Sequence, residues 1–203
     1  MTHERAVQVG IGPLSLSEVV AVARHGAKVE IAPESMAAIE AARAHVDRLA
    51  CSGEPVYGVS TGFGALATKY IDPSLRHQLQ RSLIRSHAAG TGPRVETEVV
   101  RALMLLRLST MCTGRTGVRA STARAYAALL NAGITPCVPE YGSLGCSGDL
   151  APLSHCALAL MGEGEVLDAG GRGVAAAEAL AAAGLSPVEL EEKEGLALIN
   201  GTD

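Results

Sequence analysis

The sequence predicts a predominantly α-helical fold with a few short β-strands. Apolar residues recur at helical spacing in several long segments of the 203-residue chain. Hydrophobic residues make up 48% of the chain, but aromatic residues only 2%, and tryptophan is absent. Alanine and leucine therefore dominate the packing, which favours closely approaching helices over a β-sandwich. Only short runs, such as residues 6–9 and 29–31, have the composition of strands.

Charge and cysteine usage exclude several classes of partner. The formal net charge is −4 and no basic run stands out, so nucleic acid is not expected as a partner. Charged residues interrupt every apolar stretch before membrane-spanning length, and the N-terminus lacks the apolar core of a signal peptide. The five cysteines form no CxxC pair and no metal-binding spacing with histidine, so no metal site is predicted. An odd, scattered set indicates reduced thiols and a cytoplasmic protein. These cysteines are Cys51, Cys112, Cys137, Cys146 and Cys156.

The first half of the chain contains three predicted helices. Ser15 and Glu18 fit a capping box for a helix that runs to about Arg24 and stops at Gly26. A second, alanine-rich helix follows Pro33 and ends at residues 52–53. The third covers residues 74–89, with Gly90 as its stop. Its predicted inward face carries Leu75, Leu79, Leu83 and Ile84.

His87 falls near the end of that inward face. The residues alone indicate either a hydrogen-bonded core histidine or one favoured by the negative end of the helix dipole.

The second half of the chain continues with helices at about 94–112 and 119–131. The apolar positions chosen for the first of these are Val95, Val99, Ala102, Leu103 and Leu106. A small apolar helix at 150–161 contains His155, which we interpret as a packed or hydrogen-bonded residue. A β-hairpin at 164–172 and a short alanine-rich helix follow. The glutamates at 189, 191, 192 and 194 are expected to form a solvated face.

Three further stretches carry unusual patterns. Residues 141–155 read YGSLGCSGDLAPLSH, a serine- and glycine-rich loop in which Asp149 opens the following helix and Pro152 occupies its first turn. Residues 56–64 read VYGVSTGFG, where three glycines prevent a regular helix and indicate a loop folded close against a neighbour. This loop lacks the pattern of a phosphate-binding loop. By composition alone, its Tyr57 is a packed aromatic at a strand end. The last stretch, residues 194–202, reads EGLALINGT and contains Asn200.

These stretches, together with the Ser86–Gly90 segment SHAAG, resemble the histidine and phenylalanine ammonia-lyase family in sequence and in order. The resemblance implies the N-terminal part of the aspartase/fumarase-like helical fold of that family. It also implies that Cys146, Ser147 and Gly148 cyclise into 4-methylidene-imidazol-5-one (MIO), with no external cofactor. The Gly148 nitrogen would attack the Cys146 carbonyl carbon, and two waters would leave, one of them carrying the Ser147 hydroxyl.

The same resemblance implies roles for individual residues. Tyr57 matches the proposed general base, although Ser60 stands where many members carry asparagine. Asp149 would orient the backbone for cyclisation, and Asn200 would lie against the ring or the substrate carboxylate. His87 would face the substrate side chain, and Ala88 beside it favours an imidazole over a phenyl ring.

The implied function is that of an N-terminal fragment of a lyase that eliminates ammonia from L-histidine and releases trans-urocanate. Family members are more than twice as long and assemble as homotetramers whose active sites draw on several subunits, so the fragment alone is expected to be inactive. Residues 1–92 would form a small mixed region with the base loop and the substrate helix. Residues 93–203 would form a helical region with the MIO loop, truncated at its C-terminal end.

Two alternatives remain open from the sequence. A phenylalanine or tyrosine ammonia-lyase, or an aminomutase of the same family, would share these motifs. From another class, a serine hydrolase could use Ser147, although the loop misses the final glycine of G-x-S-x-G by one place. Asp149 is also adjacent to Ser147 in sequence and poorly placed to orient a histidine.

Overall fold

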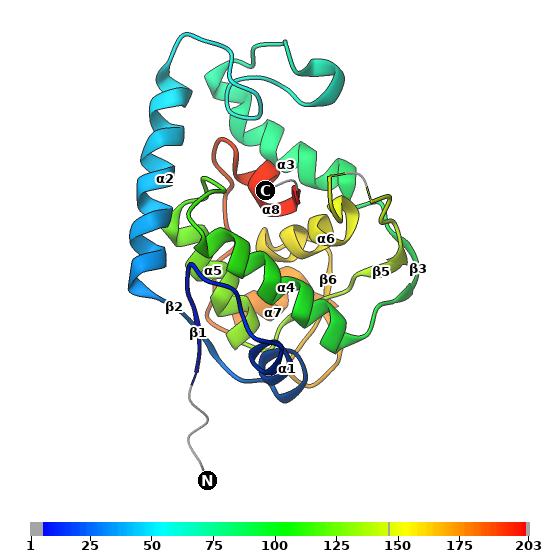
Figure 1. The fold of residues 1–203 in the computed structure, drawn as a ribbon. Coiled ribbons are helices and arrows are strands. Elements are labelled where there is room, and N and C mark those ends of the chain that lie inside the picture. The colour runs from blue at the N-terminus through cyan, green and yellow to red at the C-terminus, as the bar shows by residue number, and fades with distance from the viewer. Residues whose placement is uncertain (1–5, 146, 202–203) are drawn as a thin grey trace.

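The computed structural model describes residues 6–145 and 147–201, and helices make up most of its regular structure (Figure 1). The helices are α1 (Leu16–His25), α2 (Pro33–Cys51), α3 (Arg76–His87), α4 (Thr97–Cys112), α5 (Ala120–Asn131), α6 (Leu150–Leu160), α7 (Ala176–Ala182) and α8 (Glu194–Ile199), with 3-10 turns η1 (Gly64–Leu66) and η2 (Pro73–Leu75). The predicted helical fold class is confirmed.

The strands are short and form three small sheets. They are β1 (Val7–Val9), β2 (Val29–Ile31), β3 (Thr91–Arg94), β4 (Thr135–Pro136), β5 (Pro139–Tyr141), β6 (Glu165–Leu167) and β7 (Gly173–Ala175). Strands β1 and β2 pair in parallel, β3 and β5 pair antiparallel, and β4, β6 and β7 form an antiparallel sheet in that order. The sequence predicted β1, β2 and the β6–β7 hairpin but not β3, β4 or β5, each of which contains a proline.

Helix α1 follows the predicted signals closely. The Ser15 side chain accepts a hydrogen bond from the Glu18 amide, and the Glu18 carboxylate accepts one from the Ser15 amide. Gly26 ends the helix in the left-handed conformation, with φ of 71°. These local bonds satisfy backbone groups that a helix terminus leaves without partners.

The inward face of α3 differs from the predicted one. Leu75 lies in the preceding 3-10 turn and its side chain is 51% exposed, while Arg76 and Gln80 are buried with Leu83 and Ile84. The 3-10 turn shifts the helical phase, and long polar side chains occupy positions that a purely apolar pattern assigns to the core. The helix ends at His87, before the predicted stop at Gly90.

The predicted apolar positions of α4 are only partly confirmed: Leu103 packs against the core, but two others do not. Val99 and Leu106 are each 51% exposed, whereas Val100, Met104 and Leu105 are buried. Apolar residues surround most of this helix, so periodicity alone did not determine which stripe faces the core.

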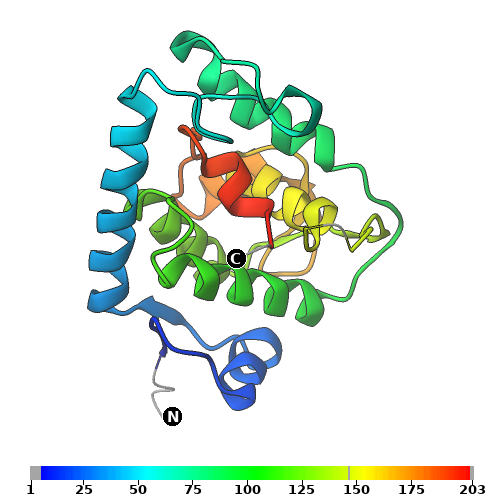
Figure 2. The same ribbon diagram turned by 45° about the horizontal axis from the view of Figure 1, so that its top comes forward.

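The short helix α8 lies in the middle of the molecule. Figure 2 shows it in red, with α2, α3, α4 and α6 around it. The α4 side chain of Arg107 donates to the Ala197 carbonyl at 3.3 Å, and the α2 side chain of Arg43 donates to the Glu192 carbonyl at 2.9 Å. These bonds hold α8 and the segment before it between α2 and α4.

No helix within residues 6–145 and 147–201 is long and apolar enough to cross a membrane. The division into regions 1–92 and 93–203 stays a prediction. Its boundary, between residues 92 and 93, falls inside strand β3, which pairs with β5.

Candidate functional site

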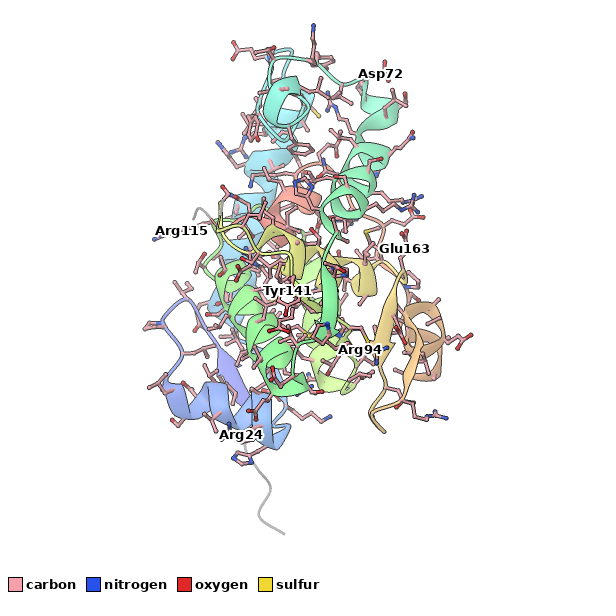
Figure 3. The ribbon with its side chains drawn as sticks, turned by 90° about the vertical axis from the view of Figure 1, so that its right-hand side faces the viewer. Arg24, Asp72, Arg94, Arg115, Tyr141 and Glu163 are labelled. Carbon is pink, nitrogen blue, oxygen red and sulfur yellow. The ribbon has the colours of Figure 1, made fainter. Side chains whose placement is uncertain are left out.

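The loop of residues 142–149, here called the signature loop, connects β5 to α6. At its start, Gly142 packs against Gly90, and a Cβ on Gly142 would lie 3.0 Å from the Gly90 Cα. One strand over, the Tyr141 ring covers Gly92, where a Cβ would lie 2.5 Å from the ring. Figure 3 looks onto this face and labels Tyr141 and Arg94. The β3–β5 pair thus fixes the entry to the loop.

Ser147 and Gly148 both adopt left-handed backbone conformations, with φ of 57° and 85°. For serine this conformation costs roughly 1–2 kcal/mol, so the surrounding structure must hold it. Cys146, the first residue of the predicted ring-forming triplet, lies outside the described residues. The structure therefore describes two of the three predicted ring-forming residues, both in left-handed conformations.

The segment after α8 holds the signature loop. The Gly201 amide donates to the Ser147 carbonyl at 2.8 Å. A Cβ on Gly148 would lie 2.9 Å from the Gly201 Cα, and a Cβ on Gly201 would lie 3.0 Å from the Gly148 Cα. The two backbones therefore touch where only glycines fit. Asn200, the C-cap of α8, precedes this contact directly.

Asp149 occupies the N-cap position of α6 but makes no side-chain cap hydrogen bond. Its Oδ1 instead accepts from the Ser143 hydroxyl at 2.5 Å. The prediction that Asp149 opens this helix is confirmed, but its carboxylate closes the signature loop on itself instead of capping the helix.

His155 is hydrogen-bonded, as predicted. Its Nε2 accepts from the Gly90 amide at 3.2 Å, and burial lowers the pKa of its imidazole below the ordinary value. This bond ties α6 to the segment against which Gly142 packs. It also engages the ring nitrogen that a hydrolase would direct at Ser147, and the Asp149 carboxylate is occupied by Ser143. The geometry does not favour a serine hydrolase.

His87 lies at the end of α3, three residues before Gly90. Its Nδ1 is 2.9 Å from the Leu83 carbonyl and 3.0 Å from the Ser86 hydroxyl. A carbonyl only accepts, so the Leu83 contact places a proton on Nδ1, and in the neutral imidazole Nε2 is then an acceptor. The half-buried imidazole is thereby held in one tautomer.

Tyr57 lies in the predicted loop of residues 56–64, which folds close against α8: a Cβ on Gly58 would lie 2.7 Å from the Leu196 side chain. The Tyr57 side chain is 52% exposed, and its ring meets the Phe63 ring edge-on at 6.1 Å. It is not the packed aromatic that composition alone predicted, because Gly58 rather than Tyr57 is the residue packed against α8.

Tyr57 lines a cavity of about 440 Å³ with residues of α2 and the 114–117 turn. None of the described signature-loop residues, 142–145 and 147–149, lines this cavity. The structure thus joins Ser147 and Gly148 with the Asn200 segment, and places Tyr57 in a separate cavity.

The predicted solvated acidic face is wrong at its most important residue. Glu194 is fully buried and its carboxylate bonds to Arg119 and Thr122. Glu191 and Glu192 also pair with arginines from α2, α3 and the start of α5. A run of glutamates is solvated only when no buried cation faces it. The arginines that pair with these glutamates are distant in sequence, so the local pattern did not indicate them.

Sequence reasoning also missed Gln80, whose Oε1 accepts from the Gly195 amide at 2.9 Å inside the core. Among residues 6–145 and 147–201, no group of three histidine, cysteine, aspartate or glutamate side chains could hold a metal ion.

Comparison with known proteins places these features in a family. The profile described as aromatic amino acid lyase matches residues 14–203. The histidine ammonia-lyase of Streptomyces coelicolor is 65% identical over 197 residues, which are 97% of this chain and 38% of that protein. The probable histidine ammonia-lyase of Halobacterium salinarum is 49% identical over 202 residues, which are 100% of this chain and 38% of that protein.

Two solved structures share the fold. Histidine ammonia-lyase from Trypanosoma cruzi superposes with a TM-score of 0.89 at 38% identity, covering 98% of this chain and 38% of that one. Tyrosine aminomutase from Streptomyces globisporus gives a TM-score of 0.90 at 43% identity, covering 96% and 36%. The chain spans about 38% of the length of the curated relatives it matches. The signature loop thus lies in a chain that belongs to the aromatic amino acid lyase family.

Proposed function

We propose that this chain is the N-terminal part of a histidine ammonia-lyase, which eliminates ammonia from L-histidine without oxidation and releases trans-urocanate. The observation that carries the proposal is the backbone of Ser147 and Gly148, bent into left-handed conformations and held by the Gly201 amide. The 65% identity to a histidine ammonia-lyase supports the same assignment.

The residues of the signature loop suit an MIO group made from Cys146, Ser147 and Gly148. Gly148 has an unhindered nitrogen, and Ser147 has a β-hydroxyl that can be eliminated. The Gly148–Gly201 contact leaves no room for a side chain at either position. The ring would supply an electrophilic methylidene carbon, which no ordinary side chain provides.

The remaining proposed roles belong to side chains around the loop. Asp149, braced by the Ser143 hydroxyl, orients the backbone for cyclisation. Asn200 donates to the ring carbonyl or to the substrate carboxylate. Tyr57 takes the β-proton of the substrate.

Histidine is the proposed substrate because of His87. The Nδ1 contact to Leu83 presents Nε2 as an acceptor, which matches an N–H of a substrate imidazole and has no counterpart on a phenyl ring. The likeness to tyrosine aminomutase makes tyrosine the first competing substrate to assay.

The activity is proposed for a longer protein that carries these residues, assembled as a homotetramer. The chain spans about 38% of its curated relatives, so groups that complete the substrate site lie elsewhere. We expect the 203-residue chain alone to release no urocanate from histidine.

The test is Ser147→Ala in the longer protein. Without the β-hydroxyl the second water cannot leave and no methylidene can form, so the loss of two waters and urocanate production should both disappear. Wild-type protein should be lighter than its linear sequence by two waters. Turnover retained in the variant would refute the proposal, and fluorophosphonate labelling of Ser147 would favour a hydrolase instead.

A further inference from the structure

We propose that Glu194 is a positioning residue: its buried carboxylate sets the place of α8, and α8 in turn holds the bent backbone of Ser147. The effect of this role on catalysis rests on the proposed function. The positioning of α8 itself is argued from the contacts of the described residues. The described side-chain bonds of Glu194 go to Arg119, Thr122 and Glu191, outside the signature loop.

The Glu194 carboxylate is fully buried and accepts five hydrogen bonds. Oε1 accepts from the Arg119 amide at 2.9 Å and from the Thr122 hydroxyl at 2.6 Å. Oε2 accepts from the Arg119 Nη2 at 2.7 Å and Nε at 3.1 Å, and from the Glu191 amide at 2.9 Å. A buried ion pair offsets its desolvation only when such additional bonds are made. Here they fix the first residue of α8 to the first turn of α5 in one orientation.

The next residue provides a second anchor. The Gly195 amide donates to the Gln80 side chain, and a Cβ on Gly195 would lie 2.9 Å from the Gln80 carbonyl oxygen. Lys193, just before the helix, adopts a left-handed conformation with φ of 68°. The start of α8 is therefore held by α5 on one side and by the backbone of α3 on the other.

The C-terminal end of α8 links the position of Glu194 to the signature loop. The helix has six residues, so it spans roughly 9 Å and acts as one rigid unit. The Asn200 amide closes it by donating to the Leu196 carbonyl at 2.9 Å, and the Gly201 amide donates to the Ser147 carbonyl. A shift or tilt at Glu194 therefore moves Asn200 and loosens the bond that holds Ser147.

The experiment measures amide hydrogen exchange by NMR on the 203-residue chain, comparing the Gly201 amide with that of Val22 in α1. Glu194→Gln keeps the shape but replaces an acceptor oxygen by a donor that faces the arginine. Exchange at Gly201 should rise by at least about tenfold while exchange at Val22 stays unchanged. Glu189→Gln is the matched control, because Glu189 belongs to the same acidic stretch and its side chain is exposed.

A second variant covers the case in which Glu194→Gln does not fold. Thr122→Val removes one of the five hydrogen bonds with little change of shape, and should raise Gly201 exchange by about fivefold. Equal acceleration at Gly201 and Val22 in both variants would show general destabilisation and overturn the proposal, as would unchanged Gly201 exchange.

The same variants in the longer protein separate this inference from the proposed function. If the wild-type protein is lighter than its linear sequence by two waters and Glu194→Gln forms less of the ring, the result supports both the proposed function and the positioning role. A linear wild-type loop with accelerated Gly201 exchange in the variants refutes the proposed function and leaves the positioning role intact.

Discussion

Two glycines, Gly148 and Gly201, meet backbone to backbone at the signature loop. This contact explains why neither position accepts a side chain, although Gly201 has no unusual backbone conformation of its own. The sequence indicated that Gly148 belongs to a ring-forming triplet, but nothing in it identified Gly201 as the contact partner.

Gly201→Ala tests this contact. Its Cβ would lie 3.0 Å from the Gly148 Cα, which is backbone and cannot move aside cheaply. The free energy of unfolding should fall by about 1–3 kcal/mol, as for other overpacked sites, and ring formation in the longer protein should decrease. Urea denaturation and intact mass measure the two effects. Gly12→Ala is the control, because nothing lies within 4 Å of a Cβ there; equal stability of the two variants would contradict the contact.

The buried imidazole of His155 should make the stability of the fold depend on pH. Burial lowers the pKa of its imidazole, and the neutral Nε2 accepts from the Gly90 amide. The unfolded chain binds a proton at the ordinary pKa of about 6.5, before the folded chain does, so stability should be lost as pH falls below that value.

The measurement is urea denaturation at pH values of about 7 and 5, on either side of the ordinary histidine pKa. It compares the wild type with His155→Gln, whose amide oxygen can accept the same bond but does not titrate. The loss of stability between the two pH values should be smaller in the variant. An identical loss in both proteins would mean that His155 does not contribute to the pH dependence.

At the scale of elements, local sequence signals predicted where a helix begins and ends better than which of its faces is buried. The capping box of α1 and its terminal glycine act through neighbouring residues, so the sequence contains both partners. The inward faces of α3 and α4 depend on helices distant in sequence, and the predictions failed at Leu75, Val99 and Leu106, which are exposed. Arg76 and Gln80 are buried where backbone groups of distant segments bond to them: the Ala50 carbonyl accepts from Arg76, and the Gly195 amide donates to Gln80. Periodicity of apolar residues carries no information about such partners.

The contact between α3 and α8 can be tested with Gly195→Ala. The new Cβ would lie 2.9 Å from the Gln80 carbonyl oxygen, so the two helices must separate. We expect a loss of about 1–3 kcal/mol in the free energy of unfolding, measured by urea denaturation.

Gly53→Ala is the matched control, since Gly53 follows α2 and nothing would lie within 4 Å of its new Cβ. A loss of stability in Gly53→Ala as large as that in Gly195→Ala would count against a specific role for the α3–α8 contact.

At the scale of the whole molecule, the sequence predicted the helical class and the family, because four separated motifs retain their order. It did not predict how these motifs meet. The signature loop and the segment after α8 come together through the burial of Glu194, which in sequence is part of an apparently solvated acidic run. Tyr57 lines a cavity to which the described residues of the signature loop do not contribute. These arrangements follow from tertiary contacts rather than from local patterns.

The most direct test of the proposed chemistry is tandem mass spectrometry of the peptide that spans residues 142–149, prepared from the longer, active protein. We expect the Cys146-Ser147-Gly148 segment to be lighter than its linear sequence by two waters, and the loss to vanish in Ser147→Ala together with urocanate production. A linear segment in protein that still releases ammonia from histidine would contradict the proposed ring and its role.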